Sequence, residues 1–111
     1  MDYIAQLAEA IQQLHGGTAT YVETVPVKEV FQGKTLWEGE VEVFGLTGHP
    51  KAKKAFAWGY PSEKEPSRLE IVVVLEVPPI TSPQRAVKAT IVAEAKAIEA
   101  GVPIKKAKPL R

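Results

Sequence analysis

The sequence predicts a single two-layer α+β domain, with two helices packed on one face of a four-stranded antiparallel sheet. Three observations support this fold. Apolar residues recur at helical spacing near both ends of the chain, four strand-like segments lie between them, and short turns separate these segments. Such short connections favour a meander of antiparallel neighbours. The domain should span residues 1–102, followed by a basic and poorly ordered tail at 103–111.

The first helix is predicted to begin after Asp2 and to end before Gly16 and Gly17. Aspartate can cap the first free backbone N–H groups, and glycine readily adopts the left-handed conformation that ends a helix. One side of the helix is apolar and should face the core; it carries Ile4, Leu7, Ala8, Ile11 and Leu14.

The first two strands form a predicted hairpin. Residues 18–31 are rich in Thr, Val and Tyr, and Pro26 within them indicates an edge strand or a bulge, because proline cannot donate to a ladder. Gly33 should occupy a positive-φ position in a tight turn. The second strand, from Thr35 to about Phe44, has one apolar face, and its other face carries the carboxylates of Glu38, Glu40 and Glu42.

Two further strands and a helix complete the prediction. In residues 54–60 aromatic side chains alternate with alanine and glycine, and residues 68–77 are almost continuously apolar until Pro78 and Pro79. Ser82 and Pro83 then indicate a helix start, and Gly101 indicates its end.

The strand at residues 68–77 has apolar side chains on both faces, including Val72 and Val74. A chain of 111 residues rarely has enough protein to cover both faces of an antiparallel strand. We therefore expect a second copy to cover the second face, giving a homodimer or a higher oligomer. The alternative is a monomer with ordinary apolar surface residues. The predicted interface residues are Leu36, Phe44, Val72 and Val74.

Composition restricts the classes of function. The net charge of +1 is too small to steer the whole molecule toward nucleic acid or an acidic membrane. The chain has no cysteine, which fits a reducing compartment, and no apolar run approaches the roughly 20 residues of a membrane span. We expect a soluble, cytoplasmic protein without a membrane partner.

Two groups of residues could bind ligands. Phe56, Trp58 and Tyr60 could form a stacking platform for bases or sugars, although the same side chains could fill the core. Two lysine clusters, at Lys51–Lys54 and Lys105–Lys108, could bind a polyanion if they meet in space, or could be separate solvated runs. The predicted polyanion-binding residues are Lys51, Lys53, Lys54, Arg85 and Lys88.

Signals for catalysis are few. His49, in a Gly-His-Pro loop, is a candidate general base, and the alternative is an ordinary turn residue. Alternate glutamates on one strand lie about 7 Å apart, too far to share one cation, so we expect no metal. No phosphate-cradling glycine loop is present, so we expect no cofactor.

Three classes of function remain open. The leading hypothesis is a small non-enzymatic binding or interaction module that acts as a homo-oligomer. The second is a nucleic-acid or polyanion binder that uses the two lysine clusters. The third is a small enzyme or ligand-binding protein with a pocket between helices and sheet, near Trp58 and Tyr60.

Overall fold

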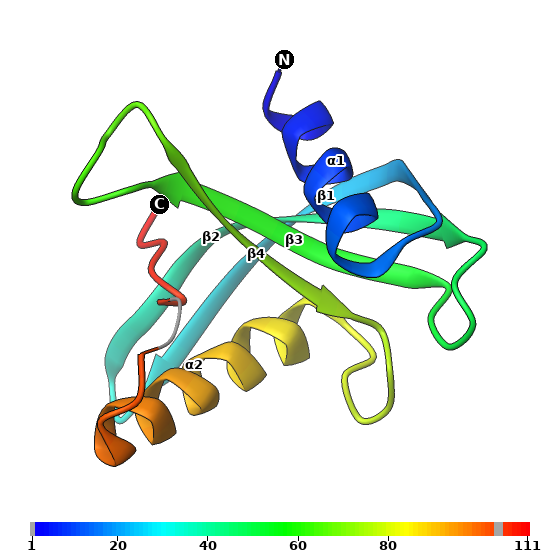
Figure 1. The fold of residues 1–111 in the computed structure, drawn as a ribbon. Helices are drawn as coiled ribbons and strands as arrows, with labels where there is room; N and C mark the ends of the chain where they lie inside the picture. The colour runs from blue at the N-terminus through cyan, green and yellow to red at the C-terminus, as the bar shows by residue number, and fades with distance from the viewer. Residues whose placement is uncertain (1, 104–105) are drawn as a thin grey trace.

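The computed structural model describes residues 2–103 and 106–111, and it confirms the α+β class and the antiparallel meander (Figure 1). The elements follow in the order α1 (Tyr3–His15), β1 (Thr18–Phe31), β2 (Lys34–Thr47), β3 (Lys54–Pro61), β4 (Leu69–Leu75) and α2 (Pro83–Ala100). The strands lie in the sheet in chain order, and each neighbouring pair is antiparallel.

The predicted helix caps and hairpin turn are confirmed. The Asp2 side chain accepts a hydrogen bond from the Ala5 backbone N–H at 2.7 Å, and the Ser82 hydroxyl accepts one from the Arg85 N–H at 3.2 Å. Between β1 and β2, Gln32 and Gly33 both have positive φ, 50° and 76°. These two residues form the tight turn whose twist suits a two-residue hairpin.

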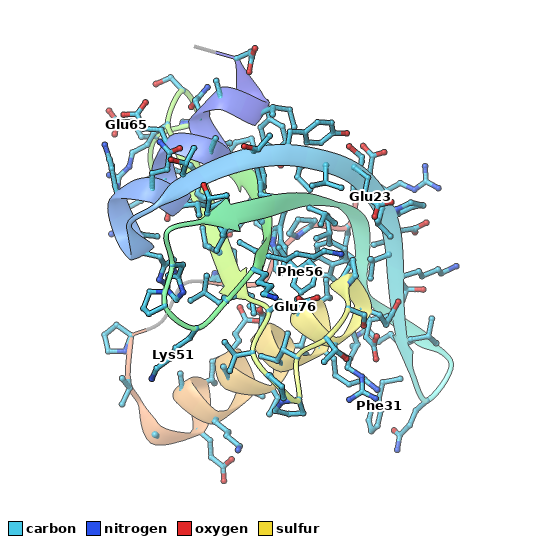
Figure 2. The ribbon with its side chains drawn as sticks, turned by 90° about the vertical axis from the view of Figure 1, so that its right-hand side faces the viewer. Glu23, Phe31, Lys51, Phe56, Glu65 and Glu76 are labelled. Carbon is cyan, nitrogen blue, oxygen red and sulfur yellow. The ribbon has the colours of Figure 1, made fainter. Side chains whose placement is uncertain are left out.

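The two helices lie on opposite faces of the sheet, so the prediction that they share one face is wrong (Figure 1). α1 packs through Leu7 and Ile11, and α2 packs through Ala86 and Val87. The α1 side of the sheet carries Phe44, Leu46, Ala55, Ala57, Ile71, Val73 and Leu75. The α2 side carries Val41, Val43, Phe56, Trp58, Val72 and Val74, and Figure 2 shows Phe56 in the interior between sheet and helix. The domain therefore has three layers, helix, sheet and helix.

Strand register explains why the assignment of faces failed. Val43 lies opposite Phe56, and Phe56 lies opposite Val74, so odd-numbered residues of β2 share a face with even-numbered residues of β3 and β4. The predicted interface of Leu36, Phe44, Val72 and Val74 instead places even-numbered residues of β2 on one face with even-numbered residues of β4. A difference of one residue in register moves every side chain of a strand to the other face.

The chain itself covers both faces of β4. Val72 is only 8% exposed within the core cluster beneath α2, and Val74 packs against that cluster. Phe44 is fully buried on the α1 side, whereas Leu36 is 38% exposed. Val72 and Phe44 are therefore buried within one chain, whereas Val74 is half-buried and Leu36 is exposed. The oligomeric state remains a prediction.

Residues 106–111 pack against the sheet, which differs from the expected poorly ordered tail. Ala107 is 2% exposed and belongs to the core cluster beneath α2, and Leu110 forms a parallel bridge with Glu38 of β2. The packed fold thus extends beyond residue 102, because backbone carbonyls of this segment pair with buried groups of the sheet. Lys105, part of the second predicted lysine cluster, lies outside the described residues.

Candidate functional site

β2 and β3 separate at one end, and residues 106–111, here called the tail, lie between them. The two strands pair from Glu42 opposite Ala57 to Gly45 opposite Lys54. Past this ladder, Glu38 pairs with the tail: its N–H donates to the Pro109 carbonyl at 3.2 Å, and its carbonyl accepts from the Arg111 N–H. We call this opening the tail groove; its borders are Trp37, Glu38 and Gly39 of β2 and Trp58, Gly59 and Tyr60 of β3.

On the β3 side of the groove, Tyr3 of α1 binds a backbone N–H group that no residue of β2 reaches. Its hydroxyl accepts a hydrogen bond from the Gly59 N–H at 2.7 Å. This bond satisfies a backbone donor that direct pairing of β2 with β3 would otherwise have used. Burial raises the pKa of the Tyr3 hydroxyl, so the group stays neutral at physiological pH.

Three aromatic side chains donate hydrogen bonds to two successive carbonyls of the tail. Trp37 Nε1 and Trp58 Nε1 both donate to the Ala107 carbonyl, at 2.8 and 3.0 Å, and the Tyr60 hydroxyl donates to the Lys106 carbonyl at 2.7 Å. The two indole rings are T-shaped, with centroids 5.3 Å apart. A buried indole N–H needs an acceptor, and here one peptide carbonyl serves both.

The N–H of the same tail residue is also bound. Ala107 N–H donates to Glu94 Oε2 of α2 at 3.3 Å, and the Ala107 side chain is almost completely enclosed. β2, β3 and α2 thus all contact one residue of the tail. The hydrogen bonds at this point go to the peptide backbone, and the side chain that is enclosed there is a methyl group.

Ion pairs hold the exposed side chains of the tail. Lys106 and Lys108 both pair with Glu63, at 3.5 and 3.4 Å, and Arg111 pairs with Glu38 at 3.2 Å. The Lys108 ammonium also lies 5.6 Å from the centroid of the Tyr60 ring, within the range of a cation–π contact. The pKa of Glu63 is lowered, first by the charge of Lys106 and then by the hydrogen bond and charge of Lys108. This carboxylate therefore stays ionised at a lower pH than an ordinary glutamate.

The tail does not fill the space at its own end. Two cavities, of about 430 and about 220 Å³, share Gly39, Glu40 and Arg111 among their lining residues. The larger cavity also reaches Pro26 and Val27 of β1. The tail therefore leaves unfilled volume beside Arg111 at the end of the groove.

The aromatic residues predicted to bind ligands are core residues that also border this groove. Phe56 is 2% exposed, Trp58 is fully buried and Tyr60 is 8% exposed. Their ring faces are not available as an open stacking platform for bases, which agrees with the core alternative. Phe56 and Trp58 lie in one buried cluster with Ala86 and Val87 of α2 and with Ala107 of the tail.

Lys54 and Lys108, one from each predicted lysine cluster, lie far apart, and the polyanion site itself stays a prediction. Lys54 begins β3, while Lys108 lies over Tyr60 six residues further along, about 20 Å away at the rise of a strand. Lys106 and Lys108 face Glu63 instead. Figure 2 shows Lys51 on a peripheral loop.

Both predicted cations of α2 have local partners. Arg85 donates to the Pro79 carbonyl at 3.2 Å, and Lys88 pairs with Glu29 at 3.7 Å. The acidic neighbour of Lys88 is thus Glu29 of β1.

His49 closes a loop. Its Nδ1 accepts hydrogen bonds from the backbone N–H groups of Lys51 and Ala52, at 3.1 and 2.9 Å. His15 packs edge-on against it, with ring centroids 6.3 Å apart. With Nδ1 engaged by two backbone donors, His49 acts in this structure as the turn residue that was the alternative to a general base.

Glu42 is the one buried carboxyl group among the described residues. It is 4% exposed, and the Thr24 hydroxyl donates to it. Burial raises its pKa, and nearby Glu40 adds to the shift. Within residues 2–103 and 106–111, no group of three or more carboxylate, imidazole or thiol side chains is placed to hold a metal ion.

Sequence reasoning missed Trp37, Glu94 and Ala107 as parts of one site. One usable signal was present, because each of two tryptophans in a small core needs a buried acceptor for its indole N–H. The identity of the accepting carbonyl depends on contacts between residues that are far apart in the sequence, by 70 positions for Trp37 and 49 for Trp58.

Comparisons of the chain with protein-family models, with curated proteins and with solved structures gave no match. None of the helices described has the length and apolar character needed to cross a membrane.

Proposed function

We propose that this protein is a non-enzymatic interaction module that binds extended peptide segments in the tail groove. One observation carries the proposal: two indole N–H groups and a carboxylate bind the carbonyl and the N–H of a single tail residue, Ala107. Glu38 adds strand-like pairing two residues further on. Backbone pairing of this kind, combined with a pocket for a particular side chain, is a common way of recognising extended peptides.

The tail fills the groove within one chain, so a partner segment has to replace it. Two features favour replacement. Of residues 106–111 only Ala107 is buried, so little apolar area holds the tail in place. Lys108 has a φ of 42°, in the left-handed region that costs a residue with a side chain roughly 1 kcal/mol.

A second copy of the chain is the partner that we propose first, because every copy carries a segment that fits the groove. Binding of one copy's tail by another would make the module a homo-oligomer, the assembly expected from the sequence. The contact would involve the tail groove in place of Val72 and Val74, which lie beneath α2.

Tryptophan fluorescence provides the test, because the chain has two tryptophans and both border the groove. In the full chain carrying Ala107→Asp, a carboxylate would have to enter a closed site beside Glu94. We expect the tail to leave and the emission to shift to longer wavelength. A peptide with the sequence of residues 106–111 should then bind saturably and reverse the shift.

The control is the same peptide with Asp in place of Ala107, which should not bind. The proposal is contradicted if the variant keeps its far-ultraviolet circular dichroism but the wild-type peptide produces no saturable change in emission. Gly39→Ala, which crowds the groove from the side of β2, provides a second variant with an intact tail sequence.

A further inference from the structure

We infer that the tail groove selects lysine-rich segments in which a small residue lies between two cations and a proline follows, so that its ligand is a basic, extended peptide. This specificity rests on the proposed peptide-binding function. It follows from the charges that face the tail, from the enclosure of Ala107 and from the contact between Pro109 and Gly39.

Each cation of residues 106–111 faces an acidic or aromatic partner on the body of the domain. Glu63 lies within 3.5 Å of both Lys106 and Lys108, and Glu38 lies within 3.2 Å of Arg111. The Tyr60 ring adds a second partner for Lys108. These contacts come from β2, β3 and the β3–β4 connection, so basic residues are favoured along the whole segment.

The position of Ala107 selects for a small side chain. Glu94 binds its N–H, Trp37 and Trp58 bind its carbonyl, and its side chain lies in the core cluster beneath α2. A larger side chain would have to push the two indole rings or the helix aside, which close-packed interiors resist.

Proline suits the position that faces β2. A Cβ on Gly39 would lie 3.0 Å from the Pro109 Cβ, so the missing side chain of Gly39 makes room for the proline ring. Pro109 has no N–H to satisfy, and its carbonyl accepts the Glu38 N–H. The contacts of residues 106–109 therefore favour, in order, a cation, a small residue, a cation and a proline.

Three peptides test this specificity against the full Ala107→Asp chain, with tryptophan emission as the readout. The first has the sequence of residues 106–111, the second has Gln in place of its three cations, and the third has Leu in place of Ala107. We expect the Gln peptide to bind about tenfold more weakly and the Leu peptide not to bind. Added salt should weaken the first peptide more than the second.

The outcomes separate the two proposals. If no peptide binds, the peptide-binding function itself is wrong. If the Gln peptide binds within about twofold of the wild-type peptide, peptide binding stands and the basic specificity is overturned. Binding of the Leu peptide overturns the small-residue requirement.

Should Ala107→Asp fail to fold, the same comparison is made inside the otherwise intact chain. Replacing Lys106, Lys108 and Arg111 together by Gln should shift tryptophan emission toward that of solvent-exposed indoles, whereas Lys106→Arg with Lys108→Arg should not. Unchanged emission in the Gln variant overturns the inference.

Discussion

Single residues determine whether the tail can lie in the sheet. Gly39 lacks the side chain that would meet Pro109, and Ala107 is small enough to lie beneath two indole rings. Neither position needs its residue for a turn, and neither has a positive φ. Both are constrained by a close approach between segments far apart in the sequence.

Gly39→Ala should therefore weaken the hold of the tail. The added Cβ would lie 3.0 Å from Pro109 and 3.2 Å from the Trp37 ring, and relieving that contact should lower the free energy of unfolding by about 1–2 kcal/mol. Urea denaturation followed by tryptophan emission measures the change. Gly45→Ala is the matched control on β2, because its nearest neighbour would be 3.7 Å away, at Val22. Equal effects at the two glycines would contradict the crowding.

Glu42 makes stability depend on pH. Its pKa is raised by burial, so the folded protein holds this proton more tightly than the unfolded chain does. The contribution to stability is fully present below the unfolded pKa of about 4.3 and decreases as pH rises through the folded pKa.

Glu42→Gln should abolish this decrease, because the side chain no longer ionises while Thr24 keeps an acceptor. Thermal unfolding midpoints measured from about pH 4 to about pH 7 should show a smaller decline in the variant than in the wild type. Glu65→Gln, at an exposed position on the β3–β4 connection, is the control. An unchanged pH dependence in Glu42→Gln would assign the decline to other groups.

Strand β4 is apolar along almost its whole length. Its nearly continuous apolar sequence arises because helices of the same chain cover both of its faces: Ile71 and Val73 pack on the α1 side, and Val72 and Val74 on the α2 side. Continuous apolar runs are typical of strands covered on both faces. A small domain can build such a strand when its two helices are on opposite faces of the sheet.

Val72→Lys should therefore lower the free energy of unfolding by about 2–5 kcal/mol, because the substitution introduces a charge beneath α2 and removes buried apolar contacts. If Val72 lay at an interface between copies, the substitution would separate an oligomer and leave the fold intact. Leu36→Lys, at a position 38% exposed, is the control and should have little effect. A Val72→Lys chain as stable as the wild type would contradict the burial.

In the proposed association between copies, the tail of one chain lies in the groove of another. If a second copy uses the tail groove, sedimentation at high protein concentration should show a species heavier than the 12.1 kDa chain. Ala107→Asp should reduce that species, because the substituted tail no longer fits any groove, whereas Leu36→Lys should leave it unchanged. A heavier species that persists in a folded Ala107→Asp chain would indicate an interface elsewhere.

The sequence alone was enough to predict the two helices, the four strands, their order and the signals that begin or end them. Asp2, Ser82, Gly33 and Gly101 act through neighbouring residues, so their effects can be read from a short stretch of sequence. The candidate site was predictable only in part. Trp58 and Tyr60 were singled out as ligand-binding residues, but their partners on the tail were not.

Tertiary structure decided which faces of neighbouring strands coincide, where α1 and α2 pack, and that residues 106–111 lie between β2 and β3. Each of these features depends on register or on contacts between distant segments. A shift of one residue in register exchanges the faces of a strand without changing its pattern, so alternation within a strand cannot reveal which neighbour it matches. Likewise, the sequence around Ala107 gives no sign that Trp37 and Trp58 donate to its carbonyl, because these contacts join residues 70 and 49 positions apart.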